Sequence, residues 1–269
     1  MLVELDKDQV AQHFGRAAQH YDQHAFIQRD IGEQLSSLIP VRYYESCLDI
    51  GCGTGASLPE LAGHSALVTA FDLSHQMLET ARNQISSERD STTQQQPDFQ
   101  WVQGDLDAMP FGTNSFDLVH SNLALQWASN LGTVIEQIGK LLKPDGVFVF
   151  SCIVEGTLFE LEQSWAAIDQ QRHINRFVKS SDLQQSLASA GFTCGEVFEK
   201  QQRWYYPSLG LMLKDMKAIG ANYVPERQTS GLMTPSQWRA LQCHYQQKFG
   251  CEAGLPVTYQ VLYGALKRG

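Results

Sequence analysis

The sequence predicts a doubly wound α/β fold, a seven-stranded, mostly parallel sheet with N-terminal helices and helical lid insertions. Two observations support this prediction. Between residues 46 and 152, short apolar runs alternate with helical patterns, which is typical of parallel sheets built from strand–helix–strand units. The first of these runs, Cys47 to Ile50, ends in the glycine turn Gly51 to Gly55, as a buried strand that enters a tight turn does.

The expected elements follow from the spacing of apolar residues. Residues 6–38 carry apolar side chains at helical spacing before Pro40, which predicts two helices ahead of the first strand. The expected strands cover residues 46–50, 67–71, 99–102, 116–119, 147–150, 192–206 and 258–266. The later helices are expected from about residue 57 and at residues 77–85, 131–142, 158–168, 181–190, 209–218 and 236–249. The polar tract at residues 86–96 is expected to be an exposed loop.

Length and composition limit the domain organisation. With 269 residues and 43% hydrophobic content, the chain can bury one large α/β core with insertions. We therefore predict a single domain over residues 1–269. Within it we expect an N-terminal helical cover at residues 1–40, a cofactor-binding core at residues 46–152, and lid or substrate insertions at residues 153–191 and 207–250.

Charge and cysteine content argue against several function classes. A formal charge of -9 without a cluster of Lys and Arg argues against nucleic-acid binding, which needs a basic face. No run of about eighteen apolar residues occurs and the N-terminus lacks an apolar segment, so we expect a cytoplasmic protein without membrane attachment. The six cysteines form no C-x-x-C pair, so we expect them to be reduced and to hold no metal.

The glycine turn predicts a cofactor site. Its glycines allow positive φ and a close ligand, and the following helix would direct its first N–H groups to the same place. Gly51, Gly53 and Ala56 also fit the dinucleotide fingerprint G-x-G-x-x-G/A. Asp49 would repel a pyrophosphate and attract a cation, by about 4 kcal/mol either way at about 4 Å and an effective dielectric of about 20. The sequence therefore favours a cofactor that carries an ammonium and a sulfonium.

Acidic residues at the ends of the next two strands extend the predicted cofactor site. Asp72 follows the second strand, where a carboxylate commonly binds the hydroxyl pair of a ribose. Its alternative role, the N-cap of the next helix, is better filled by Ser74. Asp105 follows the third strand, and from that position it could accept a hydrogen bond from the exocyclic amine of an adenine.

Tyr21 is a candidate site residue with a structural alternative. An aromatic residue at helical spacing is commonly part of the core, and we interpret Phe14 in that way. Tyr21 lies instead in the polar stretch His20 to His24, where a purely structural aromatic is less expected. We therefore expect the N-terminal helices to place Tyr21 over the cofactor.

Several motifs together resemble the class I S-adenosylmethionine-dependent methyltransferases. They are D-I-G-C-G-T-G at residues 49–55, Asp72, Gly104-Asp105 and F-D-L-V at residues 116–119. Segments outside this core resemble one family, the malonyl-acyl-carrier-protein O-methyltransferases of biotin biosynthesis. These segments lie at residues 14–21, 24–25, 121–127, 173–177 and 219–221. The tract before Pro97 looks like an insertion, and residues 222–227 match the family more loosely.

The resemblance implies an enzyme with S-adenosylmethionine as cofactor and a malonyl thioester of acyl-carrier protein or coenzyme A as substrate. Methylation of the free carboxylate would hide a charge from the fatty-acid elongation enzymes and prime pimeloyl synthesis for biotin. A malonyl carboxylate is ionised at pH 7, so it can attack the sulfonium methyl group without a general base. Placement in line at about 3 Å and exclusion of water would promote the reaction, with a cation to hold the carboxylate.

Two groups of site residues are predicted. The cofactor-binding group consists of Asp49, Gly51, Gly53, Asp72, Leu73, Asp105, Leu106 and Asn122. The catalytic group consists of Tyr21, His173 and Arg176, and no metal ligand is predicted. Arg176 is the expected anchor of the malonyl carboxylate because a guanidinium can bind both oxygens, while His173 would assist by hydrogen bonding. A surface salt bridge of Arg176 with Asp182 or Glu162 is the structural alternative.

Docking of an acidic carrier protein would need a local basic patch on this acidic chain. Lys214 and Lys217 lie three residues apart on the predicted helix 209–218, and Arg203 lies beside that insertion. An ordinary solvated helix face is the alternative. Lys140 and Lys143 are expected at the edge of the sheet opposite the site.

Three other functions remain open at this stage. A quinone-type C-methyltransferase would share the cofactor core but would need a base to remove a ring proton. A regulatory or assembly module would bind the cofactor without catalysis. A nicotinamide dehydrogenase fits the glycines but is disfavoured by Asp49.

Overall fold

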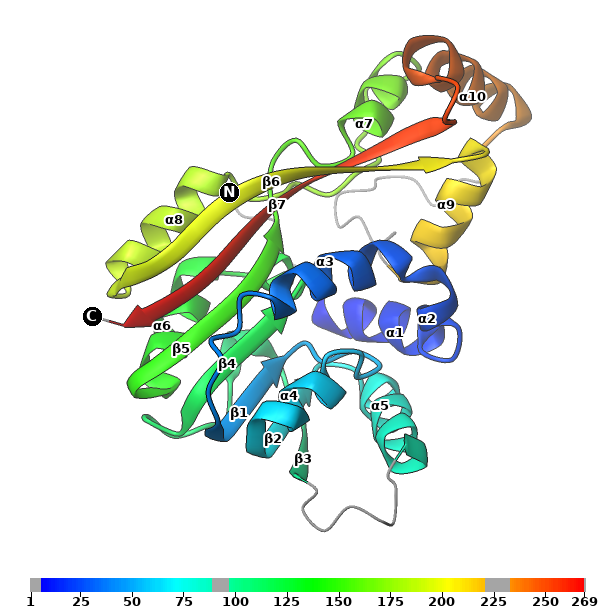
Figure 1. Cartoon of the computed structure of the whole chain (residues 1–269). Helices are drawn as coiled ribbons and strands as arrows, with labels where there is room; N and C mark the ends of the chain where they lie inside the picture. The colour runs from blue at the N-terminus through cyan, green and yellow to red at the C-terminus, as the bar shows by residue number, and fades with distance from the viewer. Residues whose placement is uncertain (1–5, 89–96, 221–232, 269) are drawn as a thin grey trace.

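The structure, a computed structural model, describes residues 6–88, 97–220 and 233–268. In this part of the chain, seven strands form one sheet in the order β3-β2-β1-β4-β5-β7-β6 (Figure 1). The first five strands are mutually parallel, and β7 is antiparallel to both of its neighbours. The predicted doubly wound, mostly parallel, seven-stranded sheet is confirmed.

The observed elements overlap the predicted ones throughout the described residues. The strands are β1 (Tyr44–Ile50), β2 (Ser65–Asp72), β3 (Asp98–Gln103), β4 (Phe116–Asn122), β5 (Leu142–Ile153), β6 (Phe192–Tyr206) and β7 (Leu255–Arg268). The helices are α1 (Lys7–Ala17), α2 (Tyr21–His24), α3 (Phe26–Ser36), α4 (Leu58–His64), α5 (His75–Glu88), α6 (Leu131–Leu141), α7 (Phe159–Ala166), α8 (Ser180–Ser189), α9 (Leu209–Ala218) and α10 (Pro235–Phe249). Two short 3-10 helices are η1 (Leu106–Ala108) and η2 (Leu125–Trp127).

Two differences from the expected elements concern the N-terminus and the polar tract. A separate helical turn, α2, lies between the two expected N-terminal helices. Residues 86–88 of the polar tract belong to α5, and residues 89–96 lie outside the described residues. The loosely matching residues 222–227 also lie outside them.

Apolar side chains cover both faces of the sheet because successive residues of a strand point to opposite faces. On β1, Cys47 packs in the same cluster as Ile31 of α3 and Leu61 of α4. The next residue, Leu48, packs on the opposite face with Ile135 of α6. Helices therefore cover both faces of the sheet, as is typical of parallel sheets.

The N-terminal helices lie beside the carboxyl ends of β1 and β4, as Figure 1 shows. The same view shows β6 and β7 extending beyond the other strands towards α7, α9 and α10. In α9, Asp215 reaches α2, where its Oδ1 lies 2.7 Å from Nδ1 of His24. The N-terminal helices and α9, which follows β6, are therefore in contact with each other.

Helix ends follow local sequence signals. Ser74 caps α5 as predicted, since its Oγ accepts a hydrogen bond of 3.4 Å from Met77 N–H. Gly191 follows α8 with a φ of 86°, a conformation that suits glycine after a helix end. Among the described residues, no helix is long and apolar enough to cross a membrane.

Candidate active site

Two adjoining cavities lie where β1, β2 and β4 end. The first has a volume of about 100 Å³ and is lined on one side by α1. Six of the residues that the sequence predicted to bind the cofactor line it: Gly51, Gly53, Asp72, Leu73, Leu106 and Asn122. The second, of about 400 Å³, lies between the glycine turn and α3 and includes Asp49. Five residues line both cavities: Tyr21, Gly51, Gly53, Asn122 and Leu123. The cavities therefore meet at the glycine turn, and Tyr21 lines both of them.

The glycine turn requires glycine for two different reasons. Gly51 has a φ of 71°, and a Cβ atom added to it would lie 2.3 Å from the Cβ of Ala124. Gly53 has a φ of 55°, but no atom lies within 4 Å of the place where its Cβ would be. Close packing therefore accounts for Gly51, whereas Gly53 leaves open space beside the backbone for a ligand.

Three N–H groups at the start of the glycine turn are engaged by acceptors of the protein itself. Gly51 and Cys52 both donate to the carbonyl oxygen of Phe71, at 2.8 and 3.1 Å. Gly53 donates to Oδ2 of Asp72 at 2.9 Å. A pyrophosphate site would need such N–H groups for its oxygens. The turn is therefore poorly suited to a dinucleotide, in agreement with the charge argument from Asp49.

Asp49 brings a buried carboxylate to the second cavity. Its side chain is 2% exposed, and its Oδ1 lies 2.7 Å from Nδ1 of His120. Its Oδ2 is buried and has no hydrogen-bond partner among the described residues. Arg29 of α3 lines the same cavity. The lining of this cavity therefore holds one cationic side chain, Arg29, and four acidic residues, Asp22, Glu33, Asp49 and Glu60, of which Asp49 has the buried oxygen without a partner.

Asp72 is held by backbone N–H groups at the end of β2. Its Oδ1 accepts from Ser74 at 2.8 Å, and its Oδ2 accepts from Gly53 at 2.9 Å. Burial raises the pKa of Asp72 to about 6; the two hydrogen bonds oppose this rise and the charge of Asp49 adds to it. At pH 7 the carboxylate is therefore mostly ionised and retains lone pairs that can accept from ribose hydroxyls.

Tyr21 lines both cavities and stays a neutral phenol. Burial raises its pKa well above the usual range, and the charges of Asp72 and Asp22 add to the rise. Asp22 also ties α2 to the site: its carboxylate accepts from Thr54 of the turn at 2.6 Å and from Gln84 of α5 at 2.7 Å. The N-terminal cover is therefore anchored where Tyr21 meets the cavities.

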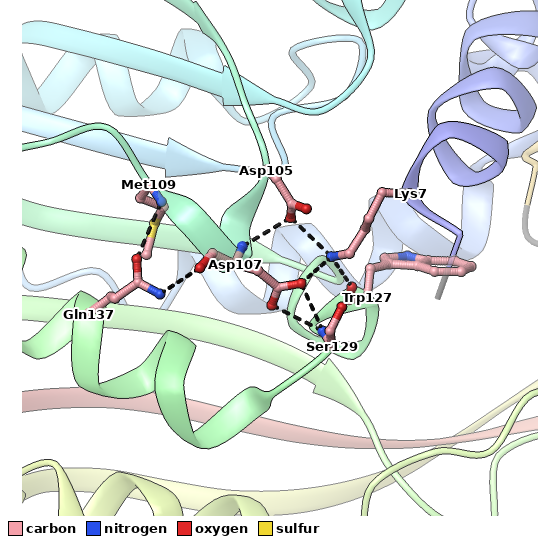
Figure 2. A network of polar contacts seen from close by, with 7 residues as sticks. All are labelled: Lys7, Asp105, Asp107, Met109, Trp127, Ser129 and Gln137. Atoms are coloured by element: carbon pink, nitrogen blue, oxygen red, sulfur yellow. Dashed lines mark hydrogen bonds and ion pairs between the residues drawn. The ribbon is translucent and has the colours of Figure 1, made fainter. Parts of the chain in front are cut away.

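Lys7 of α1 joins the segments that follow β3 and β4 through the polar network drawn in Figure 2. Its Nζ lies 3.0 Å from Oδ1 of Asp105, 2.6 Å from Oδ2 of Asp107 and 2.9 Å from the carbonyl oxygen of Trp127. The ring of Phe14 meets Trp127 edge-on, with 5.3 Å between the ring centroids. Asp105, which was predicted to face an adenine, is thus engaged by Lys7, while Leu106 lines the first cavity.

The structure does not bring His173 and Arg176 to the other predicted residues. His173 stacks on Trp165 with 3.6 Å between the ring centroids, and its Nε2 lies 2.9 Å from Oδ1 of Asp169. Arg176 is exposed, and neither residue belongs to the described lining of the two cavities. The basic residues in that lining are Lys7 and Arg29.

Comparison with known proteins identifies the family. A model of the methyltransferase domain matches residues 48–150. The chain is 34% identical to the malonyl-[acyl-carrier protein] O-methyltransferase of Enterobacter lignolyticus, and the match covers 98% of each chain. This chain belongs to the malonyl-[acyl-carrier protein] O-methyltransferase family. The resemblance that the sequence motifs indicated is confirmed.

The chain is also similar to a longer bifunctional protein and to a solved methyltransferase structure. The chain is 35% identical to the biotin biosynthesis bifunctional protein BioHC of Cellvibrio japonicus, and it spans 50% of that longer protein. A putative methyltransferase from Bacillus halodurans has a similar solved structure, with a TM-score of 0.61 and 22% identity, covering 89% of this chain and 100% of the other. The second likeness shows the shared methyltransferase fold.

The two cavities fit S-adenosylmethionine, the methyl donor of this class of enzyme. The unpartnered oxygen of Asp49 and the guanidinium of Arg29 suit the ammonium and carboxylate of its amino-acid end. Asp72 would accept from the ribose, and apolar Leu73 and Leu106 would contact the adenine. Among the described residues, no group of three or more potential metal ligands occurs.

Proposed function

We propose that this chain transfers a methyl group from S-adenosylmethionine to the free carboxylate of malonyl-acyl-carrier protein. The observation that carries the proposal is the 34% identity across 98% of the chain, which includes both insertions and the N-terminal helices. A cofactor core shared with other methyltransferases would account only for the match at residues 48–150. The product, a methyl ester, would lack the negative charge of the substrate and would prime pimeloyl synthesis for biotin.

Different residues of the two cavities bind different parts of the cofactor. Bound S-adenosylmethionine supplies an electrophilic methyl group on a sulfonium. Asp72 accepts hydrogen bonds from the ribose, and Asp49 and Arg29 neutralise the two ends of the amino-acid group. Tyr21, which lines both cavities, excludes water from their junction.

Tyr21 is suited to orienting the acceptor and unsuited to removing a proton. Because its raised pKa keeps the phenol protonated at pH 7, the hydroxyl can donate a hydrogen bond to a carboxylate. A carboxylate acceptor is already ionised and needs no general base. The chemistry available at Tyr21 therefore agrees with O-methylation of a carboxylate, in which placement is the main requirement.

The proposal gives the two arginines different ligands. Arg29 shares its cavity with Asp49, and this pair of opposite charges suits the amino-acid end of the cofactor. Arg176 is proposed to hold the malonyl carboxylate from the segment between α7 and α8, because a planar guanidinium can bind both carboxylate oxygens. His173, four residues from its partner Asp169, would help to order that segment.

Kinetics and binding separate the two arginines. Arg176→Ala should raise the Michaelis constant for the malonyl thioester by about ten-fold or more, the equivalent of about 1.4 kcal/mol, without changing the cofactor dissociation constant. Arg29→Ala should weaken cofactor binding instead. The opposite pattern would exchange the two assignments, and wild-type kinetics for Arg176→Ala would remove Arg176 from the site.

The carrier of the malonyl group is proposed to be acyl-carrier protein, with coenzyme A as the alternative. The family name supports the carrier protein, and exposed Lys214 and Lys217 on α9 offer positive charge beside the N-terminal cover. Measurement of kcat/KM for both thioesters tests this part. A value at least ten-fold higher for the carrier-protein thioester is expected, and a higher value for the coenzyme A thioester would reverse the assignment.

A further inference from the structure

A buried histidine lies directly behind the cofactor-binding carboxylate of Asp49. His120 of β4 is paired in register with Asp49 of β1, and the two side chains are 1% and 2% exposed. Their Nδ1 and Oδ1 atoms are 2.7 Å apart. The carboxylate accepts in this contact, so the imidazole donates. His120 was not predicted as a site residue, and it does not belong to the described lining of either cavity.

The second oxygen of the same carboxylate lacks a donor within the protein. Oδ2 of Asp49 is buried and has no partner among the described residues, although Asp49 lines the second cavity. A buried carboxylate oxygen without a donor is costly, and native proteins rarely leave one in that state. The arrangement therefore suits a ligand that brings its own N–H groups to Oδ2.

We propose that His120 is a positioning residue for the methyl donor. By donating to Oδ1, it fixes the rotation of the Asp49 carboxylate and leaves Oδ2 directed to the cavity, where it receives the ammonium of the cofactor. Without this donor, the carboxylate could rotate, because the last torsion of aspartate is broad. This inference rests on the proposed function, since the ligand is the methyl donor of that reaction.

The choice of histidine at position 120, rather than lysine or arginine, affects the net charge beside Asp49. A histidine can donate through Nδ1 as a neutral imidazole, and a neutral donor does not cancel the charge that a carboxylate offers to a cationic ligand. Lysine or arginine at position 120 would also hold the carboxylate but would cancel that charge. Histidine is thus a residue type that can orient the carboxylate without cancelling its attraction for an ammonium group.

Binding of two related ligands distinguishes positioning from simple support of the core. S-adenosylhomocysteine carries the ammonium group, whereas 5′-methylthioadenosine has the same adenosine but no amino-acid end. Calorimetry would be performed on the wild type, His120→Asn and His120→Leu. Asparagine can present an amide donor close to the position of Nδ1, and leucine removes the donor. Thermal unfolding of each variant checks that it is folded.

His120→Leu should bind S-adenosylhomocysteine about ten-fold or more weakly, His120→Asn should stay within about three-fold of the wild type, and all three should bind methylthioadenosine equally. If His120→Leu does not fold, His120→Ala, which also removes the donor and adds no bulk, takes its place and must show the same selective loss. Equal loss of both ligands, or no loss of either, would overturn the inference. If the wild type binds neither ligand, the proposed function fails and the inference falls with it. Normal wild-type binding with unaffected variants rejects the inference alone.

Discussion

Asp72 and Gly53 are joined by a hydrogen bond of 2.9 Å from the Gly53 N–H to Oδ2 of the carboxylate. The residue predicted to bind the ribose therefore also shapes the glycine turn. Its other oxygen, Oδ1, accepts from Ser74 at the start of α5. One side chain thus connects the turn after β1, the end of β2 and the helix that follows.

Loss of this side chain should weaken cofactor binding strongly. Asp72→Ala removes the ribose acceptor and the partner of the Gly53 N–H, so the dissociation constant measured by calorimetry should rise by roughly ten-fold or more, about 1.4 kcal/mol per decade. Asp98→Ala, a change at an exposed position at the start of β3, is the matched control and should bind normally. Unchanged affinity in Asp72→Ala would remove Asp72 from the cofactor site.

Cofactor affinity should fall in mild acid. Burial holds the pKa of Asp72 at about 6 in the free protein, and ribose hydroxyls prefer the ionised carboxylate. Binding therefore lowers this pKa, so affinity is constant above about pH 6 and decreases as the pH falls below it. We expect about ten-fold weaker binding at about pH 5 than at pH 7 in calorimetry, and a flatter profile for Asp72→Asn. A wild-type profile that is flat over this range would contradict the assignment.

Tyr21→Phe should reduce turnover while stability is nearly kept. The change removes only the hydroxyl, whose hydrogen bond to the acceptor would be made during the reaction, and it leaves the packing of α2 intact. We expect a fall in kcat of about ten-fold or more, with little change in the melting temperature. Tyr43→Phe, at a position that is 69% exposed, serves as the control. A normal rate for Tyr21→Phe would indicate a structural role.

Charge reversal on α9 should affect one thioester only. Lys214 and Lys217 are exposed, and α9 contacts α2 through Asp215 and His24. The double change Lys214→Glu and Lys217→Glu should raise the Michaelis constant for the malonyl-carrier-protein substrate several-fold and spare the coenzyme A thioester.

The matched control for this pair is Lys140→Glu with Lys267→Glu, at exposed positions on α6 and β7. It introduces the same change in net charge at a distance from α9 and should leave both Michaelis constants nearly unchanged. Equal effects of the α9 changes on both substrates would reject a docking patch there.

Most of the fold could be predicted because its signals are local. Apolar runs broken by glycines or acids defined the parallel strands, and the predicted range of β6, residues 192–206, is the observed one. The cofactor residues at strand ends were predictable for a related reason: in a parallel sheet these ends meet at one edge. Gly51, Gly53, Asp72, Leu73, Leu106 and Asn122 accordingly line the first cavity.

The remaining site residues depend on contacts between distant parts of the chain. His120 and Asp49 are 71 residues apart, and a histidine within an apolar strand carries no signal of its partner. Lys7 and Asp105 are 98 residues apart, so the engagement of Asp105 by α1 was not foreseen. Arg29 lies on a helix whose pattern predicts only its buried face. Arg176 was predicted to bind the malonyl carboxylate because the reaction needs a cation beside the methyl acceptor, and this role stays a prediction.

The most direct test of the proposed function is to incubate the protein with S-adenosylmethionine and malonyl-acyl-carrier protein and to identify the product by mass spectrometry. Acetyl-carrier protein, which lacks a free carboxylate, is the matched control substrate. We predict a single added methyl group, present as an ester on the malonyl carboxylate, and no methylation of the acetyl control. An unmodified malonyl thioester together with methylation of a quinone precursor would contradict the account and assign the chain to C-methylation.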